Sequence, residues 1–353
     1  MTKPRVLLCD DSRVYATALR RMLEYDNDIA VVAVCGTAEE TIAALPGVRP
    51  DLVTMDIELP GMDGLQAVEE IMSSAPVPIL VLSAHVGASG DKAAAALAAG
   101  ALAAFGKDDL DLRNPAGAGG AAFRRRVKVL SRARVIRHLR FTPGARPKAR
   151  SGGRDLARTA AVIGVCASTG GPQVLARLLT GLPADYPIPL LIVQHIGASF
   201  TEGLARWLDQ TAQLPVAIAK AGAPAGPGAW IAPEGSHLRF MPAGLLFLDR
   251  RSGPGQYRPS GDVLLESIAT AAGRAGVAIV LSGMGSDGAA GAAAVHRAGG
   301  LAIAQDEQSS AIYGMPRAAV ERGVDVIQAP DEITASLLSL SYAPLARLWC
   351  GNR

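Results

Sequence analysis

The sequence has few cysteines, few charged residues and no long apolar run. Its four cysteines lie at least 26 positions apart, so no pair has the spacing of a metal or redox motif, and we expect reduced thiols. The longest stretch without a polar side chain, residues 93–106, has 14 residues, short of the ~18 apolar residues of a membrane span. Two aspartates directly follow the first apolar stretch, where a secretory signal would have none. We therefore expect a cytoplasmic protein without direct membrane insertion.

The composition indicates two folded domains. At 49% hydrophobic and 19% charged residues, the chain is not a disordered tail. Its 353 residues correspond to about two domains of ~150 residues each. The net charge of +3 is unevenly distributed, because residues 1–111 are predominantly acidic, residues 112–160 contain a single acidic residue among many lysines and arginines, and residues 161–353 are nearly balanced.

The basic block has two halves. In the first, Phe123, Val127 and Leu130 recur at helical spacing among arginines and lysines, which predicts an amphipathic helix with a basic face. The second, residues 140–158, contains prolines and glycines and predicts a linker. Such a block could contact nucleic acid, or it could be a solvated helix face plus a tether that rests against the acidic N-terminal block. Because no recognition helix or aromatic stacking platform accompanies it, we favour the second interpretation and expect no nucleic-acid partner.

Short apolar runs alternate with helical patterns on both sides of this linker. We expect strands at residues 6–9, 29–34, 52–55, 79–82, 161–165, 190–193, 277–281 and 301–304. Strands separated by helices of 10 to 15 residues imply right-handed crossovers and parallel sheets. The predicted fold class is therefore α/β, with two doubly wound parallel-sheet domains in tandem and no internal repeat. We place the domains at residues 1–139 and 160–353, with a basic linker at 140–159.

An acidic cluster is predicted in the first domain. Asp10 and Asp11 follow the first strand, and Asp56 ends the third. The carboxyl ends of strands in a doubly wound sheet converge on one crevice, so the three carboxylates should meet there. Crowded carboxylates repel one another, and a hard divalent cation held by few protein oxygens, as Mg²⁺ is, would compensate them.

A hydroxyl and an ammonium group are expected at the same edge. Ser83 ends the fourth strand and Lys107 follows the fifth, where they could hold the oxygens of a transferred phosphoryl group. Taken singly, such residues are equally explained as helix caps or surface lysines.

Together with Asp10, Asp11 and Asp56, these residues make the block resemble the receiver domain of two-component response regulators. The resemblance implies a flavodoxin-like fold, phosphorylation of Asp56 by a histidine kinase, and Mg²⁺ held by Asp10, Asp11 and Asp56. Two positions differ from the usual receiver pattern: Asp108 stands where a proline commonly follows the lysine, and Ala104 stands where an aromatic switch residue is usual, with Phe105 one place later.

A nucleophile site is predicted in the second domain. Ser168 lies between the end of one strand and the start of a helix, His195 ends the next strand, and Asp287 follows the strand at 277–281. Alone, Ser168 could cap the helix or belong to an anion-binding glycine loop. With the other two it has what an activated serine needs: an imidazole that takes its proton and a carboxylate that orients the imidazole.

Flanking glycines predict an oxyanion site. They would let the backbone amides of Thr169 and Met284 approach a developing negative charge. For the remaining histidines a structural role is expected, although His237 could line the pocket; these are His85, His138, His237 and His296. We interpret Cys166 as a buried strand residue.

The second domain resembles the catalytic domain of CheB-type chemotaxis methylesterases. The motifs that carry the resemblance are Ser168-Thr-Gly-Gly, Gln194-His195, Ala232-Pro with His237, Arg258-Pro-Ser260, Gly283-Met-Gly-Ser-Asp287-Gly, and residues 304–316. One position, Glu234, is commonly glycine in that family. The resemblance implies a Rossmann-like fold and hydrolysis of glutamate γ-methyl esters on the cytoplasmic region of chemoreceptors. It also implies release of methanol, deamidation of receptor glutamines, no cofactor for the esterase chemistry, and gating by the receiver.

Two other classes of protein remain as alternatives. One is a response regulator whose output domain binds a partner without catalysis, in which a serine-directed reagent would not label Ser168. The other is a DNA-binding regulator that uses the arginine-rich block, which predicts salt-sensitive affinity for DNA.

Overall fold

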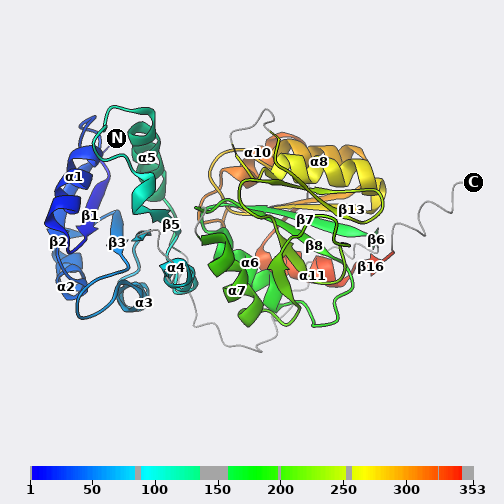
Figure 1. The fold of residues 1–353 in the computed structure, drawn as a ribbon, viewed down its shortest axis with the longest axis horizontal. Helices are drawn as coiled ribbons and strands as arrows, with labels where there is room; N and C mark the ends of the chain where they lie inside the picture. The colour runs from blue at the N-terminus through cyan, green and yellow to red at the C-terminus, as the bar shows by residue number, and fades with distance from the viewer. Residues whose placement is uncertain are drawn as a thin grey trace, which may run out of the picture. The chain divides into compact units, whose positions relative to one another are not determined.

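The predicted α/β class with two tandem parallel-sheet domains is confirmed (Figure 1). A computed structural model describes residues 2–83, 89–135, 158–197, 200–251, 257–324 and 326–343. The chain divides into two compact units, built mainly from residues 1–141 and from residues 142–353. Among the described residues, no helix is long and apolar enough to cross a membrane.

The first unit is a five-stranded parallel sheet in the order β2-β1-β3-β4-β5. Its strands are β1 (Arg5–Cys9), β2 (Ala30–Cys35), β3 (Leu52–Asp56), β4 (Ile79–Ser83) and β5 (Ala103–Gly106). Its helices are α1 (Arg13–Leu23), α2 (Ala38–Val48), α3 (Gly64–Ser74), α4 (Ser89–Ala98), the short 3₁₀ helix η1 (Lys107–Asp109) and α5 (Ala118–Leu130). Strands β3 and β4 are buried along their whole length, as expected where helices cover both faces of a parallel sheet. The strand order is the flavodoxin-like one, with its reversal between β1 and β3.

The predicted amphipathic helix is α5, and it buries its apolar side with Phe123, Val127 and Leu130 in the core. The prediction of a solvated basic face is wrong for Arg124, whose side chain is only 3% exposed. Its guanidinium donates to Asp26 at 2.7 Å and to two backbone carbonyls, so burial is compensated. Lys128 pairs with Asp28 at 2.5 Å on the more exposed side. The basic helix therefore rests against the acidic N-terminal block.

The second unit is built on a seven-stranded parallel sheet in the order β15-β14-β13-β7-β8-β10-β9. Its strands are β7 (Val162–Ala167), β8 (Leu190–Gln194), β9 (Val216–Ile218), β10 (Ala229–Ile231), β13 (Gly276–Val280), β14 (Leu301–Gln305) and β15 (Val326–Gln328). Its helices are α6 (Gly171–Thr180), α7 (Thr201–Thr211), α8 (Gly261–Ala272), the 3₁₀ helix η3 (Gly273–Ala275), α9 (Ala289–Arg297), α10 (Met315–Glu321) and α11 (Pro330–Leu338). Figure 1 shows α8 and α10 on one face of this sheet and α6 and α7 on the other. The strand order reverses beside β7, as in a Rossmann-like sheet, which makes the ends of β7 and β13 the expected crevice.

Two small sheets were not expected from the sequence. Strands β11 (His237–Phe240) and β12 (Leu246–Asp249) form an antiparallel pair, and β6 (Thr159–Ala160) pairs with β16 (Ser341–Tyr342). These strands, like the three-residue β9, β10 and β15, are too short to produce a continuous apolar run. Residues 136–157, which hold most of the predicted linker, lie outside the described residues, and the domain boundaries remain predictions.

Two candidate sites at the ends of parallel strands

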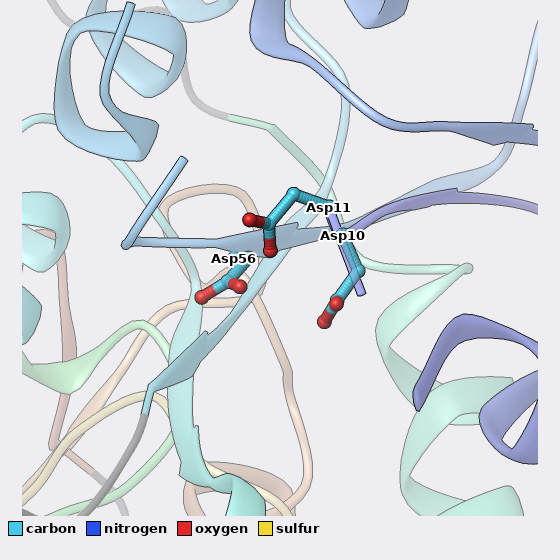
Figure 2. A group of neighbouring side chains, drawn as sticks. All are labelled: Asp10, Asp11 and Asp56. Atoms are coloured by element: carbon cyan, nitrogen blue, oxygen red, sulfur yellow. The ribbon is translucent and has the colours of Figure 1, made fainter. Parts of the chain in front are cut away.

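The carboxylates of Asp10, Asp11 and Asp56 gather at one end of the first sheet (Figure 2). One oxygen from each lies within 4.8 Å of the others. Asp10 and Asp11 follow β1, and Asp56 is the last residue of β3, so the two strands at the reversal of the sheet deliver all three. Asp10 and Asp56 are buried, whereas Asp11 is exposed. An oxygen-only donor set with one solvent-facing member fits Mg²⁺, which keeps several waters when bound by one or two carboxylates.

Lys107 reaches into this cluster. Its Nζ lies 2.6 Å from Oδ2 of Asp56 and 2.7 Å from Oδ2 of Asp10. Burial raises the pKa of Asp56, and the contact with Lys107 offsets that only in part, so the net shift is upward. Ser83, at the end of β4 and fully buried, pairs in register with Gly106 immediately before the lysine. The structure thus brings all five predicted residues of this site to one sheet edge.

The departure at Ala104 changes which aromatic ring lies near the lysine. Ala104 is buried in β5, while Phe105 packs against Phe123 of α5 with 5.3 Å between ring centroids. The aromatic ring near the lysine comes instead from α1, because Nζ of Lys107 lies 4.5 Å from the centroid of Tyr15. Tyr15 was missed by the sequence analysis, since nothing in the pattern of α1 distinguishes it from other half-buried residues.

Ser168 and His195 follow neighbouring strands of the second sheet. Strands β7 and β8 pair in register up to Ala167 and Gln194, and the amide of His195 donates to the carbonyl of Ala167 at 2.9 Å. Ser168 is held from the other side by its amide, which donates to Ser282 at the end of β13. The side-chain amide of Gln194 donates to the carbonyls of Ser168 and His195 at 2.8 and 3.0 Å. The loops that carry the two residues are therefore tied together.

Asp287, in the segment that follows β13, contacts His195. Nε2 of His195 is 2.8 Å from Oδ2 of Asp287. The carboxylate also accepts from the hydroxyl of Ser260 at 2.7 Å, from the amide of Gly261 at 2.6 Å and from the amide of Asp262 at 3.1 Å. Burial would raise the pKa of Asp287, but these donors and His195 outweigh it and lower the pKa to about 2. The N-terminus of α8 thus keeps this carboxylate ionised.

The imidazole of His195 contacts Asp287 through one of its two nitrogens, Nε2. Both ring nitrogens are buried without a hydrogen bond among the described residues, although Nε2 lies 2.8 Å from Oδ2 of Asp287. Within the same described residues, the hydroxyl of Ser168 forms no hydrogen bond with the ring. Catalytic hydrogen bonds are often loose before substrate binds. The three residues converge at one sheet edge, with the His195–Asp287 contact formed and no hydrogen bond between Ser168 and His195.

A second aromatic ring was also missed. Tyr257 stacks on the imidazole of His195, with ring centroids 4.4 Å apart and an angle of 16° between the planes. It directly precedes the Arg258-Pro-Ser260 motif, which was recognised for its resemblance alone. Neither the stack nor the role of Ser260 in binding Asp287 could be found from strand ends, because this segment belongs to no strand.

The predicted oxyanion donors adjoin one close contact between Ser168 and Gly283. Ser168 lies so close to Gly283 that a Cβ on the glycine would be 2.8 Å from that of the serine. The amides of Thr169 and Met284 flank this contact, and neither donates a hydrogen bond to any described residue. Gly170, which follows Thr169, has a φ of 74° and forms the N-cap of α6. Two unpaired amides next to a serine can bind a negatively charged oxygen.

The other singled-out residues have different surroundings. Cys166 is fully buried in β7, as expected, and burial raises its pKa well above the usual value. His237 is buried at the start of β11, and burial together with Arg258 and Arg239 lowers its pKa. His296 is exposed on α9, whereas His85 and His138 lie outside the described residues.

Comparison with known proteins matches both units. The family model "CheB methylesterase" matches residues 163–337, and the model "Response regulator receiver domain" matches residues 6–111. Protein-glutamate methylesterase/protein-glutamine glutaminase 3 of Myxococcus xanthus is 40% identical, with 96% of this chain and 95% of that protein covered. Protein-glutamate methylesterase/protein-glutamine glutaminase 2 of Anaeromyxobacter dehalogenans is also 40% identical, over 96% and 97%. The crystal structure of the Thermotoga maritima CheB methylesterase catalytic domain is 34% identical and covers 51% of this chain and 98% of its own, with a TM-score of 0.49.

Proposed function

The chain belongs to the CheB methylesterase family, with a response regulator receiver domain preceding the methylesterase domain, and from this we propose that it is a protein-glutamate methylesterase and protein-glutamine glutaminase regulated by phosphorylation. Its substrates are the γ-methyl esters and glutamines of chemoreceptor cytoplasmic regions, which makes it a cytoplasmic enzyme of chemotaxis signalling. The observation that carries the proposal is the meeting of Ser168, His195 and Asp287 at adjacent strand ends.

Attack on the ester uses the open side of His195. Because Nε2 faces Asp287, Nδ1 is the nitrogen that takes the proton as Oγ of Ser168 bonds to the ester carbonyl carbon. Asp287, ionised down to a pH of about 2, orients the imidazole and stabilises the imidazolium that forms. The carbonyl oxygen becomes an oxyanion that accepts from the amides of Thr169 and Met284.

The second half of the reaction releases the receptor glutamate. The imidazolium returns its proton to the departing methoxide, so that methanol leaves and an acyl ester remains on Ser168. A water then attacks this ester and gives its proton to His195, after which the serine is regenerated. With a glutamine substrate, ammonia leaves in place of methanol and the remaining steps are the same. No cofactor enters this scheme.

The receiver supplies the regulation. Asp56 accepts a phosphoryl group from a histidine kinase. Asp10, Asp11 and Asp56 would hold Mg²⁺, which would supply positive charge beside the phosphoryl oxygens. Lys107 and Ser83 then bind phosphoryl oxygens. Since the phosphoryl group adds about −1.5 to −2 charges, Lys107 must exchange its contacts with Asp10 and Asp56 for the new group. This exchange at β4 and β5 is the event that relieves inhibition of the methylesterase domain.

The test is methanol release from methylated receptor cytoplasmic fragments. The full chain should release methanol, and a small phosphodonor with Mg²⁺ should increase the rate. Ser168→Ala should reduce turnover by about 10⁶-fold, because the triad acts as a unit, and Asp56→Asn should remove only the response to the phosphodonor. Methanol release by Ser168→Ala at the wild-type rate would refute the proposed nucleophile, and an unchanged phosphodonor response in Asp56→Asn would refute the proposed switch.

A further inference from the structure

Tyr257 contacts His195, the base of the proposed triad, and has no role in the reaction scheme or in the family resemblance. Tyr257 covers one face of the His195 imidazole, with planes inclined by 16° and centroids 4.4 Å apart. Such nearly parallel contact fixes the plane of a ring, whereas a single contact at its edge leaves the ring free to rotate about its last side-chain bond. The edge contact of His195 is the one to Asp287, made at Nε2.

The remaining contacts of His195 do not fix that plane. Neither ring nitrogen forms a hydrogen bond among the described residues, and Nε2 lies 2.8 Å from Oδ2 of Asp287. The ring is nonetheless well shielded, because its side chain is only 12% exposed. The contact with Asp287 orients one edge of the imidazole, and the phenol ring of Tyr257 packs against its face.

Tyr257 lies between the segment that binds Asp287 and the turn after Met284. It is followed within five residues by Ser260, Gly261 and Asp262, the three donors that bind Asp287. Its hydroxyl lies near the turn after Met284, since a Cβ on Gly285 would be 3.4 Å from that oxygen. One segment thus positions the carboxylate on one edge of the imidazole and an aromatic ring on its face.

We propose that Tyr257 is a positioning residue for His195, which holds the plane of the imidazole so that Nδ1 faces the hydroxyl of Ser168. This inference rests on the proposed Ser168–His195 chemistry. The aromatic ring, and not the hydroxyl, carries the role, because the ring makes the stack and its π face also favours the imidazolium formed after proton transfer.

The first test measures the nucleophile without a receptor. Diisopropyl fluorophosphate reacts with an activated serine: Oγ bonds to phosphorus, fluoride leaves, and the serine proton passes to His195. Labelling of the full chain is followed by mass spectrometry, with Ser168→Ala as the blank. Tyr257→Ala should slow labelling about 10- to 100-fold, the loss expected when a reacting group is displaced by ~1 Å, whereas Tyr257→Phe should stay within about 3-fold of wild type.

Two further variants separate the role from general destabilisation. Tyr342→Ala is the matched control, because Tyr342 is a similarly exposed tyrosine in β16, which pairs with β6 at the opposite end of β7 from Ser168; it should label like wild type. Tyr257→Leu keeps an apolar side chain but lacks the aromatic face, and it should remain slow. In methanol release, Tyr257→Ala should lower kcat and leave KM within about 2-fold, since the ground-state contacts are unchanged.

Several results would overturn the inference. Wild-type labelling rates in Tyr257→Ala or Tyr257→Leu would show that the ring is not needed, and equal losses in Tyr257→Phe and Tyr257→Ala would transfer the role to the hydroxyl. A change in KM alone would make Tyr257 part of the substrate-binding wall instead. A wild-type chain that is not labelled at Ser168 would refute the proposed nucleophile as well, so the two failures are distinguishable.

Discussion

Replacing Asp287 by asparagine tests how much the attraction between this carboxylate and the His195 imidazolium contributes to the proposed reaction. In the proposed reaction His195 gains a full charge 2.8 Å from the carboxylate, and an effective dielectric constant of about 20 gives an attraction of roughly 6 kcal/mol at that distance. Asparagine retains the shape of the side chain and a dipole, so part of this attraction to the imidazolium remains. At 1.36 kcal/mol per tenfold change, a loss of about 4 to 5.5 kcal/mol lowers kcat by roughly 10³- to 10⁴-fold.

The loss has a second cause in the proton position of the imidazole. The carboxylate favours the tautomer with its proton on Nε2 and leaves Nδ1 as the base, whereas the NH₂ group of an asparagine would donate to Nε2 and place the ring proton on Nδ1. That tautomer cannot accept the proton of Ser168. The defect should therefore appear in kcat and in the rate of Ser168 labelling, with KM little changed.

The assay compares Asp287→Asn with Asp331→Asn, both by methanol release and by serine labelling. Asp331 is the matched control because it forms a two-bond ion pair with Arg177 on α6 and not with a residue of the predicted triad. Tryptophan fluorescence verifies folding of the second unit, since Trp207, Trp230 and Trp349 all follow residue 160. If Asp287→Asn retains more than about a tenth of wild-type turnover while folded, the attraction calculated from the 2.8 Å contact is not used in the reaction.

Three other predictions concern metal, pH and packing. Removal of Mg²⁺ by a chelator should abolish phosphorylation of Asp56 by a small phosphodonor and leave unstimulated methanol release unchanged, as measured by phosphate incorporation and by methanol assay. Because the pKa of Asp287 is lowered to about 2, its ionised form stabilises the folded state above the unfolded-state pKa of ~3.9, and this contribution of about 2.5 kcal/mol is lost as the pH falls from ~4 through 2. The free energies of unfolding of wild type and Asp287→Asn, measured by tryptophan fluorescence, should therefore differ less at pH 2 than at pH 6. Arg124→Ala should destabilise the first unit by about 2–4 kcal/mol, since it leaves buried carbonyls unpaired. Lys128→Ala should cost less than about 1 kcal/mol, because it removes a half-exposed ion pair. Thermal unfolding followed by circular dichroism measures both losses, and equal losses would contradict the reasoning.

The sequence was sufficient to predict those parts of the sites that lie at strand ends. A parallel sheet buried on both faces leaves continuous apolar runs, and the residue after each run must lie at the carboxyl edge. For this reason the sequence alone assigns Asp56, Lys107, Ser168, His195 and Asp287 to two sheet edges. The roles of these residues in phosphorylation and hydrolysis stay predictions that the experiments above test.

The residues that the sequence did not predict act through tertiary contacts without a periodic signal. Tyr257 and Ser260 approach the site from a segment before α8 that belongs to no strand, so their positions depend on the path of the chain rather than on a local pattern. Arg124 was assigned to a solvated face because arginine is rarely buried unless it is paired. Its partners, Asp26 and two carbonyls, are about 100 residues away or in a neighbouring loop, and no spacing rule connects them.

The two sites solve the problem of a buried carboxylate in opposite ways, and the difference matches what each carboxylate has to do. Asp287 receives a hydroxyl and two helix-terminal amides besides His195, so its pKa is lowered and it stays a fixed anion throughout the reaction. Asp56 receives one backbone amide and shares Lys107 with Asp10, and burial outweighs these so that its pKa is raised. An under-compensated carboxylate is one on which a divalent cation has the most effect, because the cation supplies the charge that the protein does not. Dependence on Mg²⁺ is therefore expected at Asp56 and not at Asp287, and exchange of the two environments, rather than of the two aspartates, would be needed to exchange their roles.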